Sequence, residues 1–377
     1  MKIVVLGAGA VGTVVARDLA APGRYEIQVL DASDAALAPL KKEGLKTQKA
    51  DLSDLKAIPK AVQSADLVVE CLPGFLGYAA LKAVLEAGKD VVDVSFMPED
   101  ALVLNDLART TKTTAIVDMG VAPGMSNMIV GYETEVFDEA HEARIYVGGL
   151  PVERTFPFQY KAPFSPLDVI QEYIRPARYR ISGQEVVDPP LSAPEYVEFT
   201  GIGTLEAFLT DGLRSLLTTL LIPTMVEKTL RYPGYAALIR KLRECGFFDE
   251  KLVQIAGVKI RPIDFTSRLL IDQWKLLPGE REFTVMRIEV SGVKNKKHFK
   301  KIYDLQHYTD EVNDQTSMAQ TTGFPCAVAA HLLAEGKFKK KGVFPPEILG
   351  RDPAIFNFFM KELAKRGVHF GACVQEL

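Results

Sequence analysis

The feature that most constrains this fold is a glycine-rich run directly after the first apolar segment. Lys2–Leu6 predicts a buried strand, and Gly7 to Gly12 read GAGAVG before a helical pattern begins. Such glycines allow a tight turn, close approach of a pyrophosphate, and close packing of helix on strand, with the phosphates at the helix N-terminus. An ordinary glycine-rich turn is the alternative. The predicted cofactor-binding residues of this run are Gly7, Gly9, Ala10, Val11 and Gly12.

An acidic residue helps to choose between the two nicotinamide cofactors. Asp31 lies 19 residues after Gly12, at the end of the second predicted strand. Its carboxylate can accept hydrogen bonds from the ribose hydroxyls of NAD and would repel the 2′-phosphate of NADP. Ala32 and Ser33 follow, and neither offers a cation for that phosphate. We therefore expect NAD rather than NADP.

Three further residues are expected near the cofactor. Leu72 and Pro73 follow the strand predicted at Asp66–Glu70, so they are placed to line the cofactor at the carboxyl edge of the sheet. Asp51 ends the third α/β unit, where it either lies near the adenine or caps a helix.

Short apolar runs alternate with helical patterns over the first 120 residues. Strands that are apolar throughout are typical of a parallel sheet covered by helices on both faces, so residues 1–125 predict a doubly wound Rossmann domain of the α/β class. The expected strands are Lys2–Leu6, Glu26–Leu30, Asp66–Glu70, Asp90–Val94 and Thr114–Asp118.

The pattern changes in the second part of the chain. Residues 126–315 contain longer alternating runs and proline-rich connections, which predict an α+β substrate domain on a largely antiparallel sheet. Residues 316–335 are expected to be helical, and 336–377 to form a polar tail with one amphipathic helix near 353–366. We expect residues 316–377 to complete the first domain.

Composition excludes several classes of function. The net charge is −3, and the one dense basic run, Lys294 to Lys301, predicts an exposed hairpin turn rather than a nucleic-acid site. The four cysteines and five histidines are scattered, which argues against a metal site and favours reduced thiols in the cytoplasm. Polar residues in the first half of Gln315–Ala334 argue against a membrane span.

Two loops should face the nicotinamide because they follow the strands predicted at Asp90–Val94 and Thr114–Asp118. They are Val94–Glu99 and Asp118–Asn127. In the second loop, Ser126 and Asn127 either contact substrate or act as ordinary helix caps. The expected substrate-binding residues here are Ser95, Gly124 and Asn127.

Several longer motifs resemble the saccharopine dehydrogenase-like family. GVAPGMSN at Gly120–Asn127, YVGGLP at Tyr146–Pro151, EAFLTDGLRSLL at Glu206–Leu217 and SMAQTTGFP at Ser317–Pro325 carry this resemblance. Within the family, the chain looks most like the lysine 6-dehydrogenase branch. The motifs for this branch are LPGFLGY at Leu72–Tyr78, DVSFMPE at Asp93–Glu99, RPAR at Arg175–Arg178 and PPEILG at Pro345–Gly350.

The resemblance implies a homo-oligomer, at least a dimer, that transfers hydride between a nicotinamide and a carbon bearing nitrogen. In the lysine branch, the ε-carbon of L-lysine reduces NAD⁺, and the product hydrolyses to a semialdehyde that can cyclise. In the saccharopine branch, the substrate is a secondary amine with extra carboxylates, and NADP is common. Asp31 favours the lysine branch. A non-catalytic NAD-binding sensor is the alternative from another class.

An amine must lose a proton before it can release hydride, so the site needs a base or a water path. Asp118, at a strand end, is the first candidate, and Tyr160 and His307 are weaker ones. A substrate carboxylate calls for an arginine, whose planar fork binds both oxygens. We expect Arg214 or Arg175 in this role, with Arg178 and Arg231 as further options; a salt bridge is the alternative for each. The Phe-rich stretch Phe156–Phe164 is either a dimer contact or core.

Overall fold

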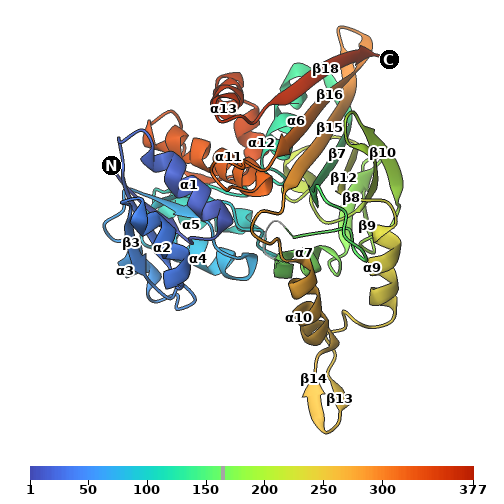
Figure 1. Cartoon of the computed structure of the whole chain (residues 1–377). Coiled ribbons are helices and arrows are strands. Elements are labelled where there is room, and N and C mark those ends of the chain that lie inside the picture. Colours follow the sequence, from blue (N-terminus) through green and yellow to red (C-terminus); the bar gives the residue numbers. More distant parts are fainter. Residues whose placement is uncertain (163–165) are drawn as a thin grey trace. The chain divides into compact units, whose positions relative to one another are not determined.

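The computed structural model describes residues 1–162 and 166–377, and these residues form two compact units (Figure 1). The first unit comprises Met1–Asp138, Arg214–Leu220 and Ala319–His369, and the second comprises Glu139–Leu213, Leu221–Met318 and Phe370–Leu377.

The first unit contains a seven-stranded sheet in the order β17-β6-β5-β4-β1-β2-β3, in which every pairing is parallel. Its strands are β1 (Lys2–Leu6), β2 (Glu26–Asp31), β3 (Lys46–Lys49), β4 (Leu67–Glu70), β5 (Asp90–Asp93), β6 (Thr114–Ile116) and β17 (Gly342–Phe344). Its helices are α1 (Ala10–Ala20), α2 (Asp34–Lys42), α3 (Ile58–Val62), α4 (Gly74–Glu86), η1 (Ala101–Leu104), α5 (Asn105–Thr110), α6 (Met125–Val136), α8 (Leu216–Thr219), α11 (Ser317–Ala334, from Ala319), α12 (Pro346–Gly350) and α13 (Pro353–Lys365).

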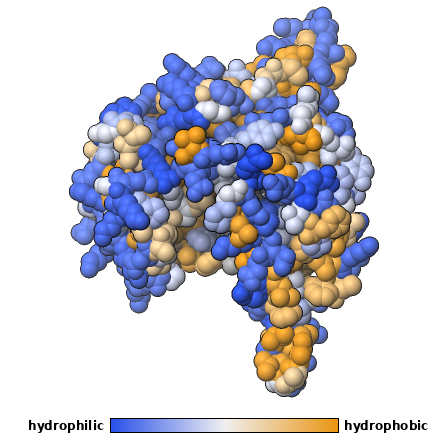
Figure 2. Space-filling view, in the orientation of Figure 1, coloured by the Kyte–Doolittle hydropathy of each residue, from blue (hydrophilic) through white to orange (hydrophobic). Residues whose placement is uncertain are grey.

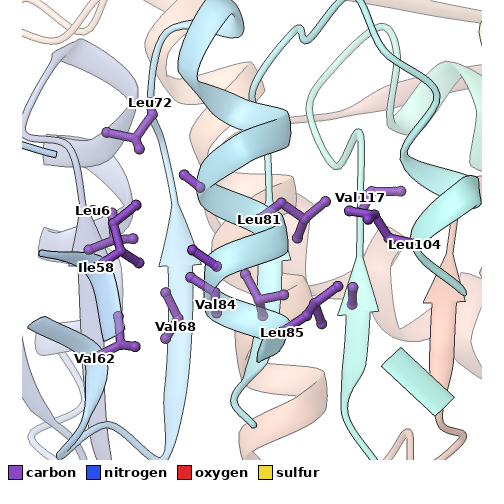
Figure 3. Close-up of a cluster of buried hydrophobic side chains, with 14 of the residues drawn as sticks. Leu6, Ile58, Val62, Val68, Leu72, Leu81, Val84, Leu85, Leu104 and Val117 are labelled. Atoms are coloured by element: carbon purple, nitrogen blue, oxygen red, sulfur yellow. The ribbon is translucent and has the colours of Figure 1, made fainter. Parts of the chain in front are cut away.

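Helices α3, α4 and α5 pack one face of this sheet. The contact is a continuous apolar layer in which Val84 of α4 lies beside Val68 of β4, while Leu81 of α4 extends toward Val117 (Figure 3). Val68, Leu81 and Val84 are fully buried. Burying such side chains contributes roughly 1.5–3 kcal/mol each. This layer fixes the carboxyl ends of the parallel strands at one edge of the sheet.

The second unit contains a nine-stranded mixed sheet with the main order β10-β11-β12-β7-β15-β16-β18. Only β12 and β7 pair in parallel; the other described pairings are antiparallel. The strands are β7 (Glu139–Pro151), β8 (Ala177–Ile181), β9 (Gln184–Asp188), β10 (Glu195–Phe199), β11 (Gly203–Leu209), β12 (Thr224–Arg231), β15 (Glu282–Lys294), β16 (Lys297–Tyr308) and β18 (Phe370–Glu376). The unit also has α7 (Pro166–Glu172), α9 (Tyr235–Glu244), α10 (Pro262–Trp274) and a separate hairpin, β13 (Val253–Ile255) with β14 (Val258–Ile260).

The predicted α/β fold is confirmed, and all five expected strands are present with ends within two residues of those predicted. Two strands of the parallel sheet were not predicted. Strand β3 reads KTQK and has no apolar pattern because it lies at the sheet edge. The expectation of a polar tail after residue 336 was wrong, because β17 extends the parallel sheet and β18 joins the mixed sheet.

The compact units also differ from the expected division at residues 125 and 315. Helix α6 stays with the first unit because Gly131 and Gly350 let α6 and α12 pack closely: an added Cβ would lie 2.2 Å from the Glu347 carbonyl oxygen and 2.1 Å from that of Met128, respectively. The segment Arg214–Leu220 also belongs to the first unit, although it is far from it in sequence.

Candidate active site

The glycine run forms an open cradle at the start of α1. Gly7 has a φ of 100°, and a Cβ there would lie 2.4 Å from the Cys71 carbonyl oxygen. A Cβ on Gly12 would lie 2.1 Å from the Gly7 carbonyl oxygen, so both positions require glycine. By contrast, nothing lies within 4 Å of a Cβ on Gly9, which is the N-cap of α1.

No side chain caps α1, and its first turn, which includes Ala10 and Val11, has no acidic residue. An uncapped helix start beside open space fits a dinucleotide pyrophosphate, because its N–H groups can donate to the phosphate oxygens. NAD or NADP would supply a hydride acceptor here when bound.

Asp31 ends β2 beside this cradle. Its Oδ2 accepts a hydrogen bond from the Ala8 N–H at 2.7 Å, and its Oδ1 accepts one from the Ser33 N–H at 2.7 Å. These bonds hold the carboxylate against the glycine loop, where a ribose hydroxyl would lie in a Rossmann fold.

The other expected cofactor residues are in differing environments. Asp51 is exposed and accepts hydrogen bonds from the Ser53 N–H and hydroxyl, which lower its pKa; the N-cap of α3 is Ala57, so Asp51 does not cap that helix. Leu72 is buried in the apolar layer under α4, whereas Pro73 is exposed as the N-cap of α4.

Buried carboxyl groups lie at the ends of two neighbouring strands of the parallel sheet. Glu70 at the end of β4 and Asp93 at the end of β5 are paired in register and have no exposed surface. Burial raises the pKa of Glu70 well above its usual value, and the Asp93 charge adds to this. Burial likewise raises the pKa of Asp93 to about 7, although a hydrogen bond from Ser95 opposes the shift. Burial therefore disfavours the charged form of both carboxyl groups.

Ser95 is held in place by hydrogen bonds to one of these carboxyl groups and is not open to a ligand. Its N–H and hydroxyl both donate to Asp93 Oδ1. Helix α4 approaches it so closely that a Cβ on Gly77 would lie 2.2 Å from the Ser95 hydroxyl oxygen. Because Ser95 is 3 % exposed and its hydroxyl already donates to Asp93, its most direct effect is to orient that carboxyl group.

The next strand end holds an ion pair between two of the predicted site residues. Arg214 donates from Nε and Nη2 to the Asp118 carboxylate at 3.3 and 3.1 Å, and from Nη1 to the Met97 carbonyl at 2.6 Å. The two side chains are only 6 % and 7 % exposed, and the guanidinium lies over the Phe96 ring at 5.1 Å.

Both members of this pair have strained backbones. Asp118 and Arg214 each have a φ of 53°, in the left-handed region that few residues other than glycine adopt. Such strain costs roughly 1–3 kcal/mol and clusters at ligand-binding sites. The Asp118 charge also raises the pKa of Asp93 and of Glu347, so one cation, Arg214, lies among several buried carboxyl groups.

Glu347 is the fourth of these buried carboxyl groups. It lies in the first turn of α12, has no exposed surface, and accepts a hydrogen bond from the Thr219 hydroxyl at 2.5 Å. Burial raises its pKa, and the Thr219 bond opposes this. The Glu347–Thr219 contact ties α12 to α8, the short helix that follows Arg214.

The loop before α6 is built around Gly124. This residue is the N-cap of α6 with a φ of 138°, and a Cβ on it would lie 1.9 Å from the Gly120 carbonyl oxygen. Neither Ser126 nor Asn127 caps the helix, so the alternative interpretation of these two residues is wrong. Asn127 is fully buried; its Oδ1 accepts from the Ser126 hydroxyl, and its Nδ2 has no partner among the described residues.

The remaining candidates lie in the second unit. Tyr160 is 3 % exposed and packs in an aromatic core, edge-on to Tyr235 and Trp274 at centroid distances of 5.3 and 5.5 Å. Burial raises its pKa well above 10. The sequence predicts a weaker candidate base at this position, and the structure places Tyr160 in a hydrophobic core cluster of the second unit.

Arg231 lies in the same core. Its Nη2 donates to the Tyr160 and Tyr173 hydroxyls at 3.4 and 3.3 Å and to Glu172 at 3.2 Å, and the guanidinium lies 4.4 Å from the Tyr160 ring centroid. Arg178 forms a two-pronged pair with Asp211 at 2.9 and 3.0 Å, with its side chain 44 % exposed.

Arg175 and His307 are both half-buried. Arg175 follows α7, where its N–H donates to the Gln171 carbonyl at 3.0 Å. His307 Nδ1 lies 2.9 Å from the Ser317 hydroxyl, which joins β16 to the start of α11. Of the Phe-rich stretch, Phe156 is 82 % exposed and Phe158 packs on Trp274, while Phe164 lies outside the described residues.

Across the described residues, no helix is long and apolar enough to cross a membrane. Within the same part of the chain, no group of three or more His, Cys, Asp or Glu side chains is arranged to hold a metal ion.

Comparison with known protein families gives two matches that together span almost the whole chain. Residues 3–116 match the saccharopine dehydrogenase NADP binding domain, and residues 120–368 match the saccharopine dehydrogenase C-terminal domain. The chain belongs to the saccharopine dehydrogenase family. The family match extends through Arg214 and α12, which lie in the first compact unit.

Individual relatives agree with this assignment. The chain is 26 % identical to carboxyaminopropylagmatine dehydrogenase of Synechocystis over 97 % of this chain and 96 % of that one. It is 24 % identical to the NADP⁺, L-glutamate-forming saccharopine dehydrogenase of Saccharomyces cerevisiae over 98 % of each. It is 23 % identical to the alpha-aminoadipic semialdehyde synthase of Arabidopsis thaliana, and spans 36 % of that longer chain.

The apo structure of L-glutamate-forming saccharopine dehydrogenase from Saccharomyces cerevisiae superposes with a TM-score of 0.82 over 99 % of each chain, at 19 % identity. This similarity confirms the fold. None of these relatives is a lysine dehydrogenase by name.

Proposed function

We propose that this protein is an NAD(P)-dependent dehydrogenase that oxidises the secondary amine of an amino-acid or polyamine conjugate. The family membership and the full-length similarity to dehydrogenases of saccharopine and carboxyaminopropylagmatine support this proposal. The structural observation that carries it is the buried Asp118–Arg214 pair at the carboxyl edge of the parallel sheet.

The pair suits a substrate that carries both a carboxylate and a protonated amine. Arg214 and Asp118 form an ion pair in which the two charges neutralise each other. A bound zwitterion would place its carboxylate against the guanidinium and its amine against the carboxylate, so that each buried charge keeps a partner. Charge balance is conserved on binding, and the left-handed backbones of both residues hold the two groups at the strand ends.

Asp118 would also take part in proton removal. An amine releases hydride only after losing its proton, and a carboxylate within hydrogen-bond reach of the nitrogen can accept that proton directly or through water. Asp93 lies alongside and accepts from the Asp118 N–H, which fixes the backbone of the base. Most of the rate enhancement would come from holding the carbon in position against the nicotinamide.

For the cofactor, we propose a preference for NAD. Asp31 is fastened to the glycine loop by two N–H groups, where its charge would oppose a 2′-phosphate. The names of the family domain and of the yeast relative both include NADP. The proposed preference for NAD therefore rests on Asp31 of this chain and not on its relatives.

L-Lysine is the second candidate substrate, and Asp31 is the observation that favours it. The sequence motifs resemble the lysine 6-dehydrogenase branch, whose enzymes use NAD, whereas the saccharopine enzymes commonly use NADP. L-Lysine offers a primary amine at its ε-carbon and one carboxylate for Arg214.

The test is the absorbance of reduced nicotinamide at 340 nm. The purified protein is incubated with saccharopine, carboxyaminopropylagmatine or L-lysine, each with NAD⁺ and with NADP⁺. Turnover of a secondary amine supports the main proposal, and turnover of L-lysine alone moves the assignment to the second candidate. NAD binding without turnover of any of the three would contradict both and favour a non-catalytic sensor.

A further inference from the structure

Some residues of this chain lie against the usual preference of their type for surface or core. Apolar side chains of the hairpin β13–β14 in the second unit are exposed, with Ile255 at 57 % and Val258 at 61 %, and colour this projection orange in Figure 2. In the first unit several carboxyl groups are buried, although glutamate is almost never fully buried without a partner. Glu347, in the PPEILG motif, is one of them, and neither the cofactor loop nor the ion pair of Asp118 with Arg214 includes it.

The burial of Glu347 is unfavourable for the fold alone. The residue has no exposed surface, and its Oε2 atom has no hydrogen-bond partner among the described residues. Burial raises its pKa, and the hydroxyls of Thr219 and Ser215 oppose this rise. A buried acid with an unused acceptor oxygen destabilises the folded state, so a contact that serves the site would account for its presence.

The side chain of Glu347 contacts α8, the short helix that follows Arg214. Its Oε1 atom lies 2.5 Å from the Thr219 hydroxyl, which also lies 2.8 Å from the Ser215 carbonyl oxygen within α8. Arg351, at the end of α12, donates from Nη2 to the Thr219 carbonyl at 3.2 Å. The two ends of α12 therefore hold the side chain and the backbone of the last residue of α8.

The backbone of Glu347 contacts α6, the helix that follows the loop starting at Asp118. A Cβ on Gly131 of α6 would lie 2.2 Å from the Glu347 carbonyl oxygen, so the two backbones are in direct contact. Glu347 thus touches both the helix that follows the Asp118 loop and the helix that follows Arg214. All of these elements belong to the first unit.

Arg214 requires such support because its own backbone is unfavourable. Its φ is 53°, and strained conformations of this kind persist only where the surrounding structure enforces them. Helix α8 has four residues, which is too short to be stable by itself. The position of the guanidinium therefore depends on what holds α8.

We propose that Glu347 is a positioning residue for Arg214. Through Thr219 it fixes the one-turn helix that follows Arg214, and through its backbone it is itself fixed to α6. The guanidinium is thereby kept beside Asp118, where a substrate carboxylate would bind. This inference rests on the function proposed above, and it assigns a role to the PPEILG motif.

The first test is the kinetics of Thr219→Val, which removes the hydroxyl and keeps the shape of the side chain. With whichever of saccharopine, carboxyaminopropylagmatine or L-lysine the wild type oxidises, we expect kcat/KM to fall about tenfold and the KM for NAD⁺ to stay unchanged. Thr219→Ser and Glu347→Gln keep a hydroxyl and an acceptor oxygen, and we expect both to stay within about threefold of wild type. Equal activity of Thr219→Val and wild type would overturn the proposal.

Glu206→Gln is the matched control. Glu206 is also a buried acid that holds the start of a helix, since it accepts from the Gly234 and Ala236 N–H groups at 3.1 and 3.0 Å, but it lies in the second unit. We expect the specific activity of its folded protein to match that of wild type. A tenfold loss in this control would mean that any buried acid has the same effect, which would overturn the special role of Glu347.

A double-mutant cycle separates positioning from general stability. If Glu347 and Thr219 act through the guanidinium, Thr219→Val should cause little further loss of kcat/KM once Arg214→Lys has removed the planar fork. A purely structural contact would give the same factor in both backgrounds. An equal tenfold loss in the two backgrounds would therefore overturn the proposal.

Hydrogen–deuterium exchange of the full-length protein tests the support of α8 without any substrate. The amide groups of residues 217–220 donate to carbonyl groups of residues 214–216. We expect Thr219→Val to speed their exchange about tenfold and to leave the central parallel strands unchanged. Unchanged exchange in this segment would overturn the inference, whereas absence of turnover by the wild type would refute the proposed function, so the two failures are distinguishable.

Discussion

Arg214 and Arg231 are both almost completely buried, and their surroundings differ. Arg231 in the second unit is held by two tyrosine hydroxyls, an aromatic ring and Glu172. Arg214 in the first unit faces Asp118 at a strand end, with further carboxyl groups nearby and a left-handed backbone. The guanidinium of Arg231 is enclosed by core side chains. That of Arg214 lies among ionisable groups, which is the arrangement expected where a charged ligand binds.

The largest expected effect is on activity and concerns Arg214. Arg214→Lys keeps a positive charge beside Asp118 but loses the planar fork, so we expect kcat/KM to fall by about 100-fold or more with little loss of stability. The rate is followed at 340 nm and stability by thermal unfolding. A variant within a few-fold of wild type would mean that Arg214 does not contact the substrate.

For Arg231 we expect a loss of stability with little loss of activity. Arg231→Met leaves Glu172 and two buried tyrosine hydroxyls without their cation, and we expect the free energy of unfolding to fall by about 3 kcal/mol while the specific activity of folded protein is retained. Urea denaturation measures the loss. Arg178→Met is the matched control, since the Arg178–Asp211 pair is partly exposed and should contribute about 1 kcal/mol or less.

The buried carboxyl groups of the first unit predict a pH dependence of stability. Burial holds the pKa of Asp93 at about 7, above its ordinary value of 3.8, so the folded state binds a proton that the unfolded state has lost. Between about pH 4 and 7 this group therefore lowers the free energy of unfolding by up to ~1.4 kcal/mol per pH unit as the pH rises.

Asp93→Asn cannot ionise, and we expect it to flatten the fall in stability between pH 5 and 7. Chemical denaturation at several pH values measures this slope. Glu282 in the second unit, whose pKa burial also raises to about 7, should leave part of the dependence in place. An unchanged slope in Asp93→Asn would show that Asp93 is already ionised in the folded protein.

The smallest expected effect concerns the cofactor. Asp31→Ser removes the charge opposed to a 2′-phosphate, and we expect the ratio of kcat/KM for NADP⁺ to that for NAD⁺ to rise about tenfold, equivalent to roughly 1.4 kcal/mol. An equal loss with both cofactors would instead assign Asp31 to the shape of the glycine loop, through its bond to the Ala8 N–H.

The sequence predicted the parts of this molecule that local patterns determine. Apolar runs marked the central parallel strands, and the spacing of Gly7, Gly12 and Asp31 marked the cofactor loop. The edge strand β3 was missed because its exposed KTQK segment has no apolar pattern. The residue types of the loops identified Asp118 and Arg214 as separate candidates. Their ion pair was not predicted, because the two residues are 96 positions apart and no local pattern reveals such a contact.

The buried acids were missed for a related reason. Glu70 and Asp93 each end a short apolar run, where an acidic residue normally marks the point at which a strand reaches solvent. Their burial depends on α4 and the neighbouring loops closing over the strand ends, as the contact between Gly77 and Ser95 illustrates. An acid that directly follows two or three consecutive apolar strand residues is the signal that could have identified them.

The central claim is that Arg214 and Asp118 serve the substrate rather than the fold, and the variant that tests it most directly is Asp118→Asn with Arg214→Ala. Arg214→Ala alone would leave an unpaired buried carboxylate, but the double variant removes both charges. We predict that it unfolds within a few degrees of wild type and reduces NAD⁺ with saccharopine or carboxyaminopropylagmatine at about 1 % of the wild-type rate or less. A folded double variant with a rate near that of wild type would contradict the account.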